Sequence, residues 1–361
     1  MWNNKIYGLP IYPGNKIFAG AIFYRADILQ ALGLGTPAIN SIQDLYDLGK
    51  EINDPKRGRW AFDDIMSYLI QPFGVPFNPP NWTTDSKGDL IAAWETPQVI
   101  EMINWEASIV RAGMMHPESI AFQVSSGTQR FQNGSMVITG GGIGGWNGYD
   151  AVAGKAANKS YERAALPPFT ASGTGTPTIG LGSSASIFSY LNAGLSKSQV
   201  EECLRIADYI AAPFGSYEYT LTNFGAQGVD WSPSASGPAL TATGQKNVQQ
   251  TFNFLASAMN VQSVQSGYVD VVKAVCAWQQ NAGKYSYKPL FWNMNVSVPP
   301  NLANALTATA FTASNGNILE EVVRGKSTVA DFQAAVKSWQ RNGGNALRTF
   351  FDGIRAKYGD Q

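Results

Sequence analysis

Apolar residues recur at helical spacing in three segments of the chain, and each segment carries signals for where a helix begins and ends. The first segment follows Ser41 in "SIQDLYDLGKEIN", the second follows Thr96, and the third follows Thr328 in "TVADFQAAVKSWQ". Serine and threonine before an apolar stripe are typical helix N-caps, and glycine often ends a helix. The pattern therefore predicts three helices, the second ending near Gly113 and the third at Gly343–Gly344.

Short apolar runs bounded by glycine and proline predict strands between the helices. Near the N-terminus we expect a short strand, a turn at Pro13–Gly14, a strand from Ile17 to Tyr24 and a helix from about Ala26. Another strand begins at Ser135 and leads into the glycine-rich stretch "GGGIGGWNG". Since strands and helices alternate, the sequence predicts an α/β chain rather than a β-sandwich or a helix bundle.

Length and composition narrow the class of protein. With 361 residues, of which 44% are hydrophobic, the chain can bury a large core and is expected to form two lobes. Lys plus Arg number 26 and Asp plus Glu also number 26, so the sequence has no electrostatic footprint for nucleic acid or an anionic membrane. Aromatic residues make up 12% of the chain, which suits a neutral polar ligand such as a sugar.

The cysteines and the single histidine restrict the chemistry. Cys203 and Cys276 fall on two expected helices, which leaves open one disulfide or two buried thiols. A metal site built on a pair of histidines is excluded, and a catalytic triad would depend on His116 beside a proline. We expect His116 to be a surface residue at a helix end. The sequence predicts no catalytic residue, no metal and no cofactor.

Five segments, in the order of the chain, resemble motifs of the extracellular solute-binding proteins of ABC importers, in particular the carbohydrate-binding group that includes the maltose-binding protein. The resemblance covers almost the whole chain and combines strand, helix and loop motifs. The segments are "NNKIYGLPIYPGNKIFAGAIFYRADIL", "GTPAINSIQDLYDLGKEI", "RFQNGSMVITGGGIGGW", "YTLTNFGAQGVDWS" and "EEVVRGKSTVADFQAAVKSWQRNGG".

The resemblance implies a periplasmic-binding-protein-like α/β fold of two lobes joined by a hinge, with a sugar or oligosaccharide bound in the cleft between them. Closure around the ligand is then read by an ABC transporter membrane permease. The expected parts are a remnant of the first lobe with the hinge strand at 1–16, the second lobe at 17–175, a return to the first lobe at 176–292, and C-terminal helices at 293–361 that pack mainly on the second lobe. The expected hinge crossings are 14–18, 176–180 and 291–298.

The position of the "YGLP" strand bears on completeness and localisation. In the family this strand lies well inside the mature chain, after an export or lipoprotein signal and the opening units of the first lobe. The residues after Met1 have neither the basic nor the apolar region of such a signal. We therefore expect an incomplete first lobe and a longer extracytoplasmic protein, either periplasmic or anchored as a lipoprotein.

The glycine-rich stretch after the strand at Ser135 admits two functional interpretations. Gly140, Gly142 and Gly145 match the G-x-G-x-x-G pattern of a dinucleotide site, but no helix is expected to follow and face a pyrophosphate. The favoured interpretation is that the glycines let the backbone turn, so that Trp146 and Tyr149 stack on a ligand. The structural alternative for Trp146 is a core position beneath the loop.

Other candidate ligand-binding residues follow from the resemblance. Phe18 falls near a ligand-contacting acid of the family, and Asp63 or Asp64 falls near its acid and aromatic pair, where a carboxylate accepts bonds from sugar hydroxyls. An N-cap role is the alternative for both aspartates. Trp231 is expected to offer a ring to the ligand from the other lobe, and a core role is its alternative. The remaining two candidates, both near the expected hinge, are Tyr12 and Trp292.

A carbohydrate-active enzyme, such as a glycoside hydrolase or lyase, is the main competing function. A glycoside hydrolase requires two carboxylates that face each other across the scissile bond. Asp63 and Asp64 are neighbours in sequence, and neither Glu218 nor Asp230 has an identifiable mate. A binding protein without catalysis is therefore the favoured interpretation.

Overall fold

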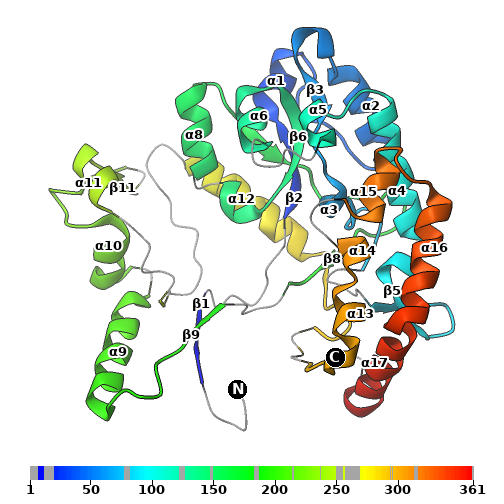
Figure 1. Cartoon of the computed structure of the whole chain (residues 1–361). Coiled ribbons are helices and arrows are strands. Elements are labelled where there is room, and N and C mark those ends of the chain that lie inside the picture. Colours follow the sequence, from blue (N-terminus) through cyan, green and yellow to red (C-terminus); the bar gives the residue numbers. More distant parts are fainter. Residues whose placement is uncertain are drawn as a thin grey trace. The chain divides into compact units, whose positions relative to one another are not determined.

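The chain divides into two units, each assembled from distant parts of the sequence (Figure 1). Unit 1 comprises residues 1–17 and 182–276, and unit 2 comprises residues 18–181 and 277–361. This computed structural model describes residues 7–11, 20–76, 82–121, 127–146, 149–182, 187–213, 215–235, 237–248, 255–256, 269–292, 294, 296–312 and 316–359.

The last passage between the units lies inside a helix. It falls between Cys276 and Ala277, within α12 (Val269–Gly283), whereas the sequence analysis placed the third crossing at 291–298. Those residues belong to unit 2. Because a continuous helix carries the chain across, neither glycine nor proline marks the passage in the sequence.

Unit 2 is built around a four-stranded sheet in the order β3-β6-β2-β7. β3 (Trp60–Phe62) runs parallel to β6 (Met136–Gly141), whereas β2 (Ala21–Arg25) is antiparallel to both β6 and β7 (Arg163–Ala165). All five residues of β2 are buried, so both faces of the sheet are covered. The expected strand and helix at the N-terminus are observed as β2 and α1 (Ala26–Ala31), while residues 12–19 lie outside the described part.

One face of the sheet contributes to the large core of unit 2. The predicted N-cap Ser41 is confirmed, since it forms a capping box with Asp44 at the start of α2 (Ile42–Ile52). Further along α2, a Cβ added at Gly49 would lie 2.2 Å from the ring of Phe62, so the helix packs closely on β3. The other helical segments before β6 are η1 (Pro55–Arg57), α3 (Met66–Leu69), η2 (Ala93–Glu95), α4 (Pro97–Arg111), α5 (Pro117–Ile120) and α6 (Gly127–Asn133).

The predicted helix after Thr96 is confirmed as α4, although the hydroxyl of Thr96 donates to the carbonyl of Ala93 at 2.6 Å instead of capping the helix. The helix ends at Arg111, just before Gly113 with its φ of +67°. His116 is the N-cap of α5, but it is buried rather than on the surface, because its ring packs edge-to-face on Trp60 with centroids 4.6 Å apart.

Charged and aromatic side chains hold a helical layer against the opposite face of the sheet. Arg25 donates to the carbonyl of Phe131 on α6 at 2.6 Å and lies 4.6 Å from the ring of Tyr161. Asp150 pairs with Arg163 at 3.0 Å and accepts a hydrogen bond from Tyr161 at 2.7 Å. Two helices follow β6 in this layer, α7 (Ile143–Trp146) and α8 (Tyr149–Ala157), so the expectation that no helix follows the glycine-rich stretch was wrong.

The C-terminal helices belong to unit 2 and share its core. Trp94 stacks on Phe311 with centroids 4.8 Å apart and meets Trp339 edge-to-face at 5.0 Å. The helix predicted after Thr328 is confirmed as α16, with a capping box at Thr328. Instead of a stop, Gly343 at φ +121° makes a kink from which α17 continues at once. These helices are α13 (Ala303–Thr307), α14 (Thr309–Thr312), α15 (Ile318–Val323), α16 (Val329–Trp339) and α17 (Asn345–Tyr358), preceded by η5 (Pro300–Leu302) and with the segment Gln340–Gly344 between the last two.

Two small strand pairs complete unit 2, and unit 1 has two more. Within unit 2, β4 (Trp82–Thr84) pairs with β5 (Leu90–Ala92), and β8 (Ile179–Gly180) runs parallel to β12 (Ser286–Tyr287). The elements of unit 1, apart from its share of α12, are β1 (Leu9–Ile11) paired with β9 (Ile187–Ser189), β10 (Trp231–Ser234) paired with β11 (Gly237–Leu240), α9 (Lys197–Ile210), α10 (Tyr217–Phe224) and α11 (Ala242–Asn247).

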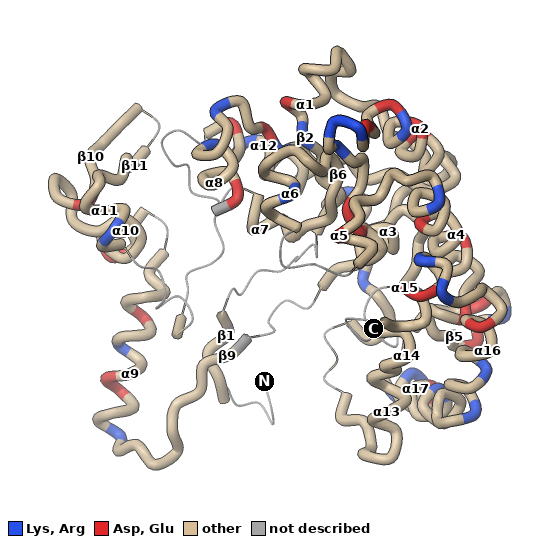
Figure 2. Tube along the Cα trace, turned by 45° about the horizontal axis from the view of Figure 1, so that its top comes forward, with Lys and Arg blue, Asp and Glu red and all other residues tan. Residues whose placement is uncertain are grey.

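The surface chemistry agrees with the balanced composition. Figure 2 shows Lys and Arg mixed with Asp and Glu along α2, α4 and α9. Cys203 and Cys276 are free, partly exposed thiols. The two alternatives that the sequence left open, one disulfide or two buried thiols, are therefore both wrong. No helix in the described part of the chain combines the length and the apolar content needed to cross a bilayer.

Candidate functional site

The glycines at the end of β6 make room for an aromatic ring, and that ring is Tyr68 of α3. A Cβ added at Gly140 would lie 1.9 Å from Cδ2 of Tyr68, and one added at Gly20 would lie 2.6 Å from Cε1. A side-chain carbon does not tolerate either distance, so Gly140 must be glycine while the ring keeps its place. At Gly20 the carbonyl oxygen of Gly141 lies closer still, so that position requires glycine with or without the ring. An aromatic ring therefore does lie against the glycine backbone of β6, but it is the ring of Tyr68 and not that of Trp146.

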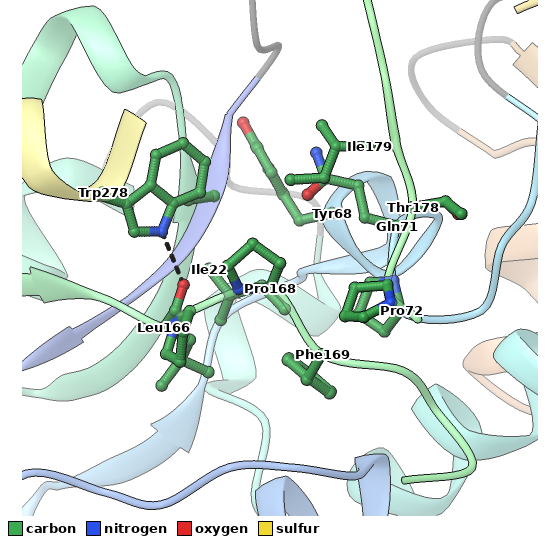
Figure 3. Close-up of a pocket in the computed structure, with 13 residues that line it drawn as sticks. Ile22, Tyr68, Gln71, Pro72, Leu166, Pro168, Phe169, Thr178, Ile179 and Trp278 are labelled. Carbon is green, nitrogen blue, oxygen red and sulfur yellow. Dashed lines mark hydrogen bonds between the residues drawn. The ribbon is translucent and has the colours of Figure 1, made fainter. Parts of the chain in front are cut away.

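Tyr68 lines a pocket that lies wholly within unit 2 (Figure 3). Gln71 follows one turn later, and Trp278 of α12 lines the pocket from a distant part of the sequence. The indole N–H of Trp278 donates to the carbonyl of Leu166 at 2.8 Å, which fixes the orientation of the ring. The lining residues are Ala21, Ile22, Tyr68, Gln71, Pro72, Leu166, Pro167, Pro168, Phe169, Pro177, Thr178, Ile179 and Trp278.

The lining of this pocket, taken over the described residues, contains no charged side chain. Rings and prolines supply most of the wall, and the polar side-chain groups are the hydroxyl of Tyr68, the amide of Gln71 and the hydroxyl of Thr178. The Gln71 amide donates to the carbonyl of Gly20 at 3.2 Å, which ties it to the start of β2. Aromatic walls with a few placed polar groups suit an uncharged ligand that has an apolar face and several hydroxyls.

The hydroxyl of Tyr68 is kept neutral by its surroundings. Burial is the main cause that raises its pKa; Arg163 partly offsets this, and the carboxylate of Asp63 adds to it. A raised pKa keeps the phenol protonated throughout the physiological range, so it can both donate and accept hydrogen bonds. It makes no hydrogen bond to any described residue, which leaves both capacities available to a ligand.

Asp63 lies in the turn between β3 and α3, close to the ring of Tyr68 but outside the pocket lining. Its carboxylate accepts a very short hydrogen bond from Ser119 and another from Thr139 at 3.3 Å, and it pairs with Arg130 at 3.5 Å. The side chain is 17% exposed. These contacts give Asp63 an internal role, and its predicted contact with a ligand stays a prediction.

Asp64 is held by a different set of partners in the same turn. It pairs with Arg324 of the C-terminal helices at 3.2 Å and accepts a hydrogen bond from the backbone N–H of Met66 at 3.2 Å. The second contact satisfies an amide at the start of α3, as the N-cap alternative implied, although the capping position itself is Ile65. A ligand role for Asp64 also stays a prediction.

Trp146 occupies the core position that was its structural alternative. It is 3% exposed, its indole N–H donates to the carbonyl of Arg163 at 3.0 Å, and its ring meets Phe23 edge-to-face with centroids 5.3 Å apart. An indole with its N–H engaged and its faces covered has little surface left for a ligand. Tyr149 begins α8, but its side chain lies outside the described part of the structure.

The remaining candidates are not among the residues that line the pocket. Trp231 is a partly buried residue of unit 1 whose N–H donates to the carbonyl of Gly225 at 3.0 Å. Trp292 is partly buried in unit 2, with the ammonium of Lys288 5.1 Å from its ring. Tyr12 and Phe18 lie outside the described residues. The ligand roles of all four stay predictions.

Tyr68, Gln71 and Trp278, which line the pocket, were not among the candidates predicted from the sequence. A signal for the first was present, because consecutive glycines inside a strand indicate that something approaches the backbone closely. The residue that approaches is Tyr68, on a helix more than 70 residues earlier in the chain. One sequence alone does not reveal that this helix packs on β6. Trp278 looked like any aromatic residue on the apolar face of a helix.

The described part of the chain contains no cluster of three His, Cys, Asp or Glu side chains that could hold a metal ion. Acids near the pocket are already engaged, since Asp63 binds Arg130 and Asp64 binds Arg324. In unit 1, the carboxylate of Asp230 accepts hydrogen bonds from the amide of Ala226 at 2.9 Å and from the side chain of Asn247 at 3.3 Å. In the described part of unit 2, the aspartates nearest the pocket are thus paired with arginines and do not line it.

The order and arrangement of these elements define a class of protein by fold. Comparison with solved structures shows that the chain has the fold of the solute-binding proteins of ABC transporters, as the sequence predicted. No family model matches the chain, and no curated protein matches it in sequence.

Three solved structures represent this similarity. The chain is 14% identical to the N-glycan transport solute-binding protein NgtS from Streptococcus pneumoniae, with a TM-score of 0.64 over 98% of this chain and 76% of that one. The chain is 12% identical to the S. pneumoniae ABC-transporter substrate-binding protein FusA in complex with kestose, with a TM-score of 0.62 over 97% of this chain and 76% of that one. It is 16% identical to the alginate-binding protein AlgQ2 without calcium ion, with a TM-score of 0.61 over 95% of this chain and 73% of that one.

The contact between Gly140 and Tyr68 can be tested by paired substitutions. We expect Gly140→Ala to lower the free energy of unfolding by about 1 to 3 kcal/mol, because the added methyl group displaces the ring. In a Tyr68→Ala background the same change should cost much less, since the ring is gone. Gly142→Ala is the matched control, because a Cβ there meets nothing within 4 Å. Chemical denaturation of the variants measures the coupling, and equal losses with and without Tyr68 would contradict it.

The core position of Trp146 leads to a separate expectation. Trp146→Ala should lower the free energy of unfolding by about 3 to 5 kcal/mol through the cavity that it leaves, and Trp146→Phe should cost less. Ligand affinity of the molecules that remain folded should hardly change. Denaturation without ligand and calorimetric titration with ligand separate the two effects. Weaker affinity with unchanged stability would return Trp146 to the list of ligand-binding residues.

Proposed function

We propose that this chain is the substrate-binding component of an ABC importer and that it binds a neutral sugar or oligosaccharide. The pocket around Tyr68 carries the proposal, because its described lining combines aromatic and proline walls with hydroxyl and amide groups and contains no charge. The fold supports the transporter assignment, since solved structures with this fold include a protein named for N-glycan transport and one in complex with kestose.

In this proposal unit 2 supplies one binding surface for the sugar. The ring of Tyr68 would stack on the apolar face of a pyranose or furanose, and its hydroxyl would bond to a sugar hydroxyl. Gln71 and Thr178 would provide further hydrogen bonds. A charged sugar would lose its hydration here without gaining an opposite charge, so neutral ligands are favoured. The expected movement of the two lobes around the ligand stays a prediction.

The other parts of the functional prediction follow from the same assignment. The protein would act outside the cytoplasm and deliver its ligand to the membrane permease of an importer. It would leave the ligand chemically unchanged, because acids do not appear among the described residues of the pocket lining and the nearby aspartates are bound to arginines.

A thermal-shift screen with neutral and acidic mono- and oligosaccharides tests the proposal. Because binding to the native state raises stability by mass action, neutral sugars should raise the melting temperature and uronic acids should not. With the best sugar, Tyr68→Ala should weaken calorimetric affinity about thirtyfold, which corresponds to about 2 kcal/mol.

Tyr46→Ala is the control for that variant, because Tyr46 is also a partly buried tyrosine of unit 2 but does not line the pocket. It should leave the affinity unchanged. Mass spectrometry of the recovered sugar should show an intact molecule. A screen in which only acidic sugars bind, or a Tyr68→Ala variant with the affinity of the wild-type protein, would refute the assignment of this pocket.

A further inference from the structure

A fully buried carboxyl group lies beside the turn that leads into α3. Glu106 of α4 is 0% exposed, and its Oε1 accepts a hydrogen bond from the backbone N–H of Ile65 at 3.1 Å. Its Oε2 is also buried and has no hydrogen-bond partner of ordinary geometry among the described residues. The acid that faces it is Asp64. A buried acceptor without a donor is costly, so this oxygen calls for an explanation.

The charges around Glu106 are unbalanced, which explains how its Oε2 can lack a donor. Among the described residues, the guanidinium of Arg324, whose side chain is 2% exposed, pairs with Asp64 and Glu320, and its charge also acts on Glu106, so three carboxyl groups share its influence. Arg324 lies 3.2 Å from Asp64 and 3.8 Å from Glu320. One buried positive charge does not compensate three negative charges at low dielectric, so at least one carboxyl must hold a proton.

Glu106 is the member of this cluster that is best suited to hold the proton. It has no exposed surface, whereas the side chains of Asp64 and Glu320 are 28% and 16% exposed and both contact Arg324. Burial is the largest cause that raises the pKa of Glu106 well above its ordinary value, and the neighbouring Asp64 raises it further. On the far side of the turn, Asp63 is paired with Arg130, which also binds Glu118 and lies near His116.

The location of the acid pair connects it to the pocket. Helix α3 has no side-chain N-cap, and its first amides are satisfied from outside the helix. Glu106 accepts a hydrogen bond from the amide of Ile65 and Asp64 accepts one from the amide of Met66, three and two residues before Tyr68. The same short helix then leads to Gln71, the second polar group of the pocket.

We propose that Glu106 is protonated in the folded protein and directs its proton at Asp64, and that this acid pair, closed by Arg324, is a pH-dependent clamp that positions α3 and the ring of Tyr68. Glu106 is thus a positioning residue, since it does not line the pocket. Loss of its proton places a second negative charge beside Asp64, which repels the turn and weakens the bonds that hold the start of α3.

The sign of the pH dependence follows from the direction of the shift. When folding raises the pKa of a carboxyl group, the group's contribution to stability is fully present at pH values below its pKa in the unfolded chain, which is about 4.3 for Glu. That stability is lost as the pH rises through the higher, folded-state pKa. The wild-type protein should therefore become less stable toward alkaline pH relative to Glu106→Gln, whose amide reproduces the protonated acid at every pH.

Infrared spectroscopy of the ligand-free protein tests where the proton lies. At neutral pH the wild-type spectrum should contain a protonated-carboxyl band that disappears on alkaline titration and is absent from Glu106→Gln. The control Glu101→Gln, an exposed glutamate on the same helix, should retain the band. If Glu106→Gln does not fold, the titration of the wild-type band and that of Glu101→Gln still decide the question.

Denaturation and hydrogen exchange test the clamp. The difference in denaturation midpoint between wild type and Glu106→Gln should shift steadily against the wild type between pH 5 and pH 9, while the difference between wild type and Glu101→Gln stays constant. Protection of the amides of Ile65 and Met66 should fall over the same range in wild type only. Absence of the carboxyl band, or a constant midpoint difference with unchanged protection, would overturn the proposal.

The consequence for ligand binding rests on the proposed function. With the best sugar from the screen, wild-type affinity should weaken several-fold across the pH range in which the carboxyl band is lost, and the affinity of Glu106→Gln should not. If sugars fail to bind while the carboxyl band and the midpoint shift are observed, the function fails and the clamp stands. If sugars bind with no such pH difference, the clamp does not control the pocket.

Discussion

The ring of Tyr68 lies directly on the backbone of β6, and the candidate site depends on this contact. At Gly140 the ring lies too close to the backbone for any side chain, and at Gly20 both the ring and the carbonyl oxygen of Gly141 do. Aromatic side chains bury a large area and need a flat partner, which a glycine backbone supplies. With the ring fixed there, Tyr68 and Gln71 line a pocket whose described walls carry no charge.

Two arginine–aspartate pairs stabilise the short turn that places this ring. Arg130 binds Asp63 and Arg324 binds Asp64, so neighbouring aspartates are held by arginines from different parts of the sequence. Because Arg324 comes from the C-terminal helices, those helices contribute to the position of α3 as well as to the core. Removing either arginine would leave a largely buried carboxylate unpaired, which costs more than an exposed pair is worth. The aspartates of the turn therefore affect the site indirectly, because their ion pairs fix the position of α3.

The α/β class and several helix boundaries could be predicted from the sequence because they follow from local signals, whereas the fold itself was expected from the resemblance of five segments to a known family. Ser41 and Thr328 form the capping boxes that their spacing indicated. Long-range pairing was not predictable in the same way. The glycines of β6 were interpreted as a turn that lets Trp146 stack on a ligand, because Trp146 is close to them in sequence and Tyr68 is not. The third passage between the units was misplaced because α12 crosses as an uninterrupted helix.

Side-chain NMR can show whether a neutral sugar binds against the ring of Tyr68, as we propose. Protein with labelled tyrosine and tryptophan side chains would be titrated with the sugar that gives the largest thermal shift. Binding in the pocket should produce saturable shifts of the Tyr68 ring and the Trp278 indole with one common affinity, while the signals of Trp146 stay unchanged. Saturable binding that leaves Tyr68 and Trp278 unchanged and shifts other aromatic residues would contradict it.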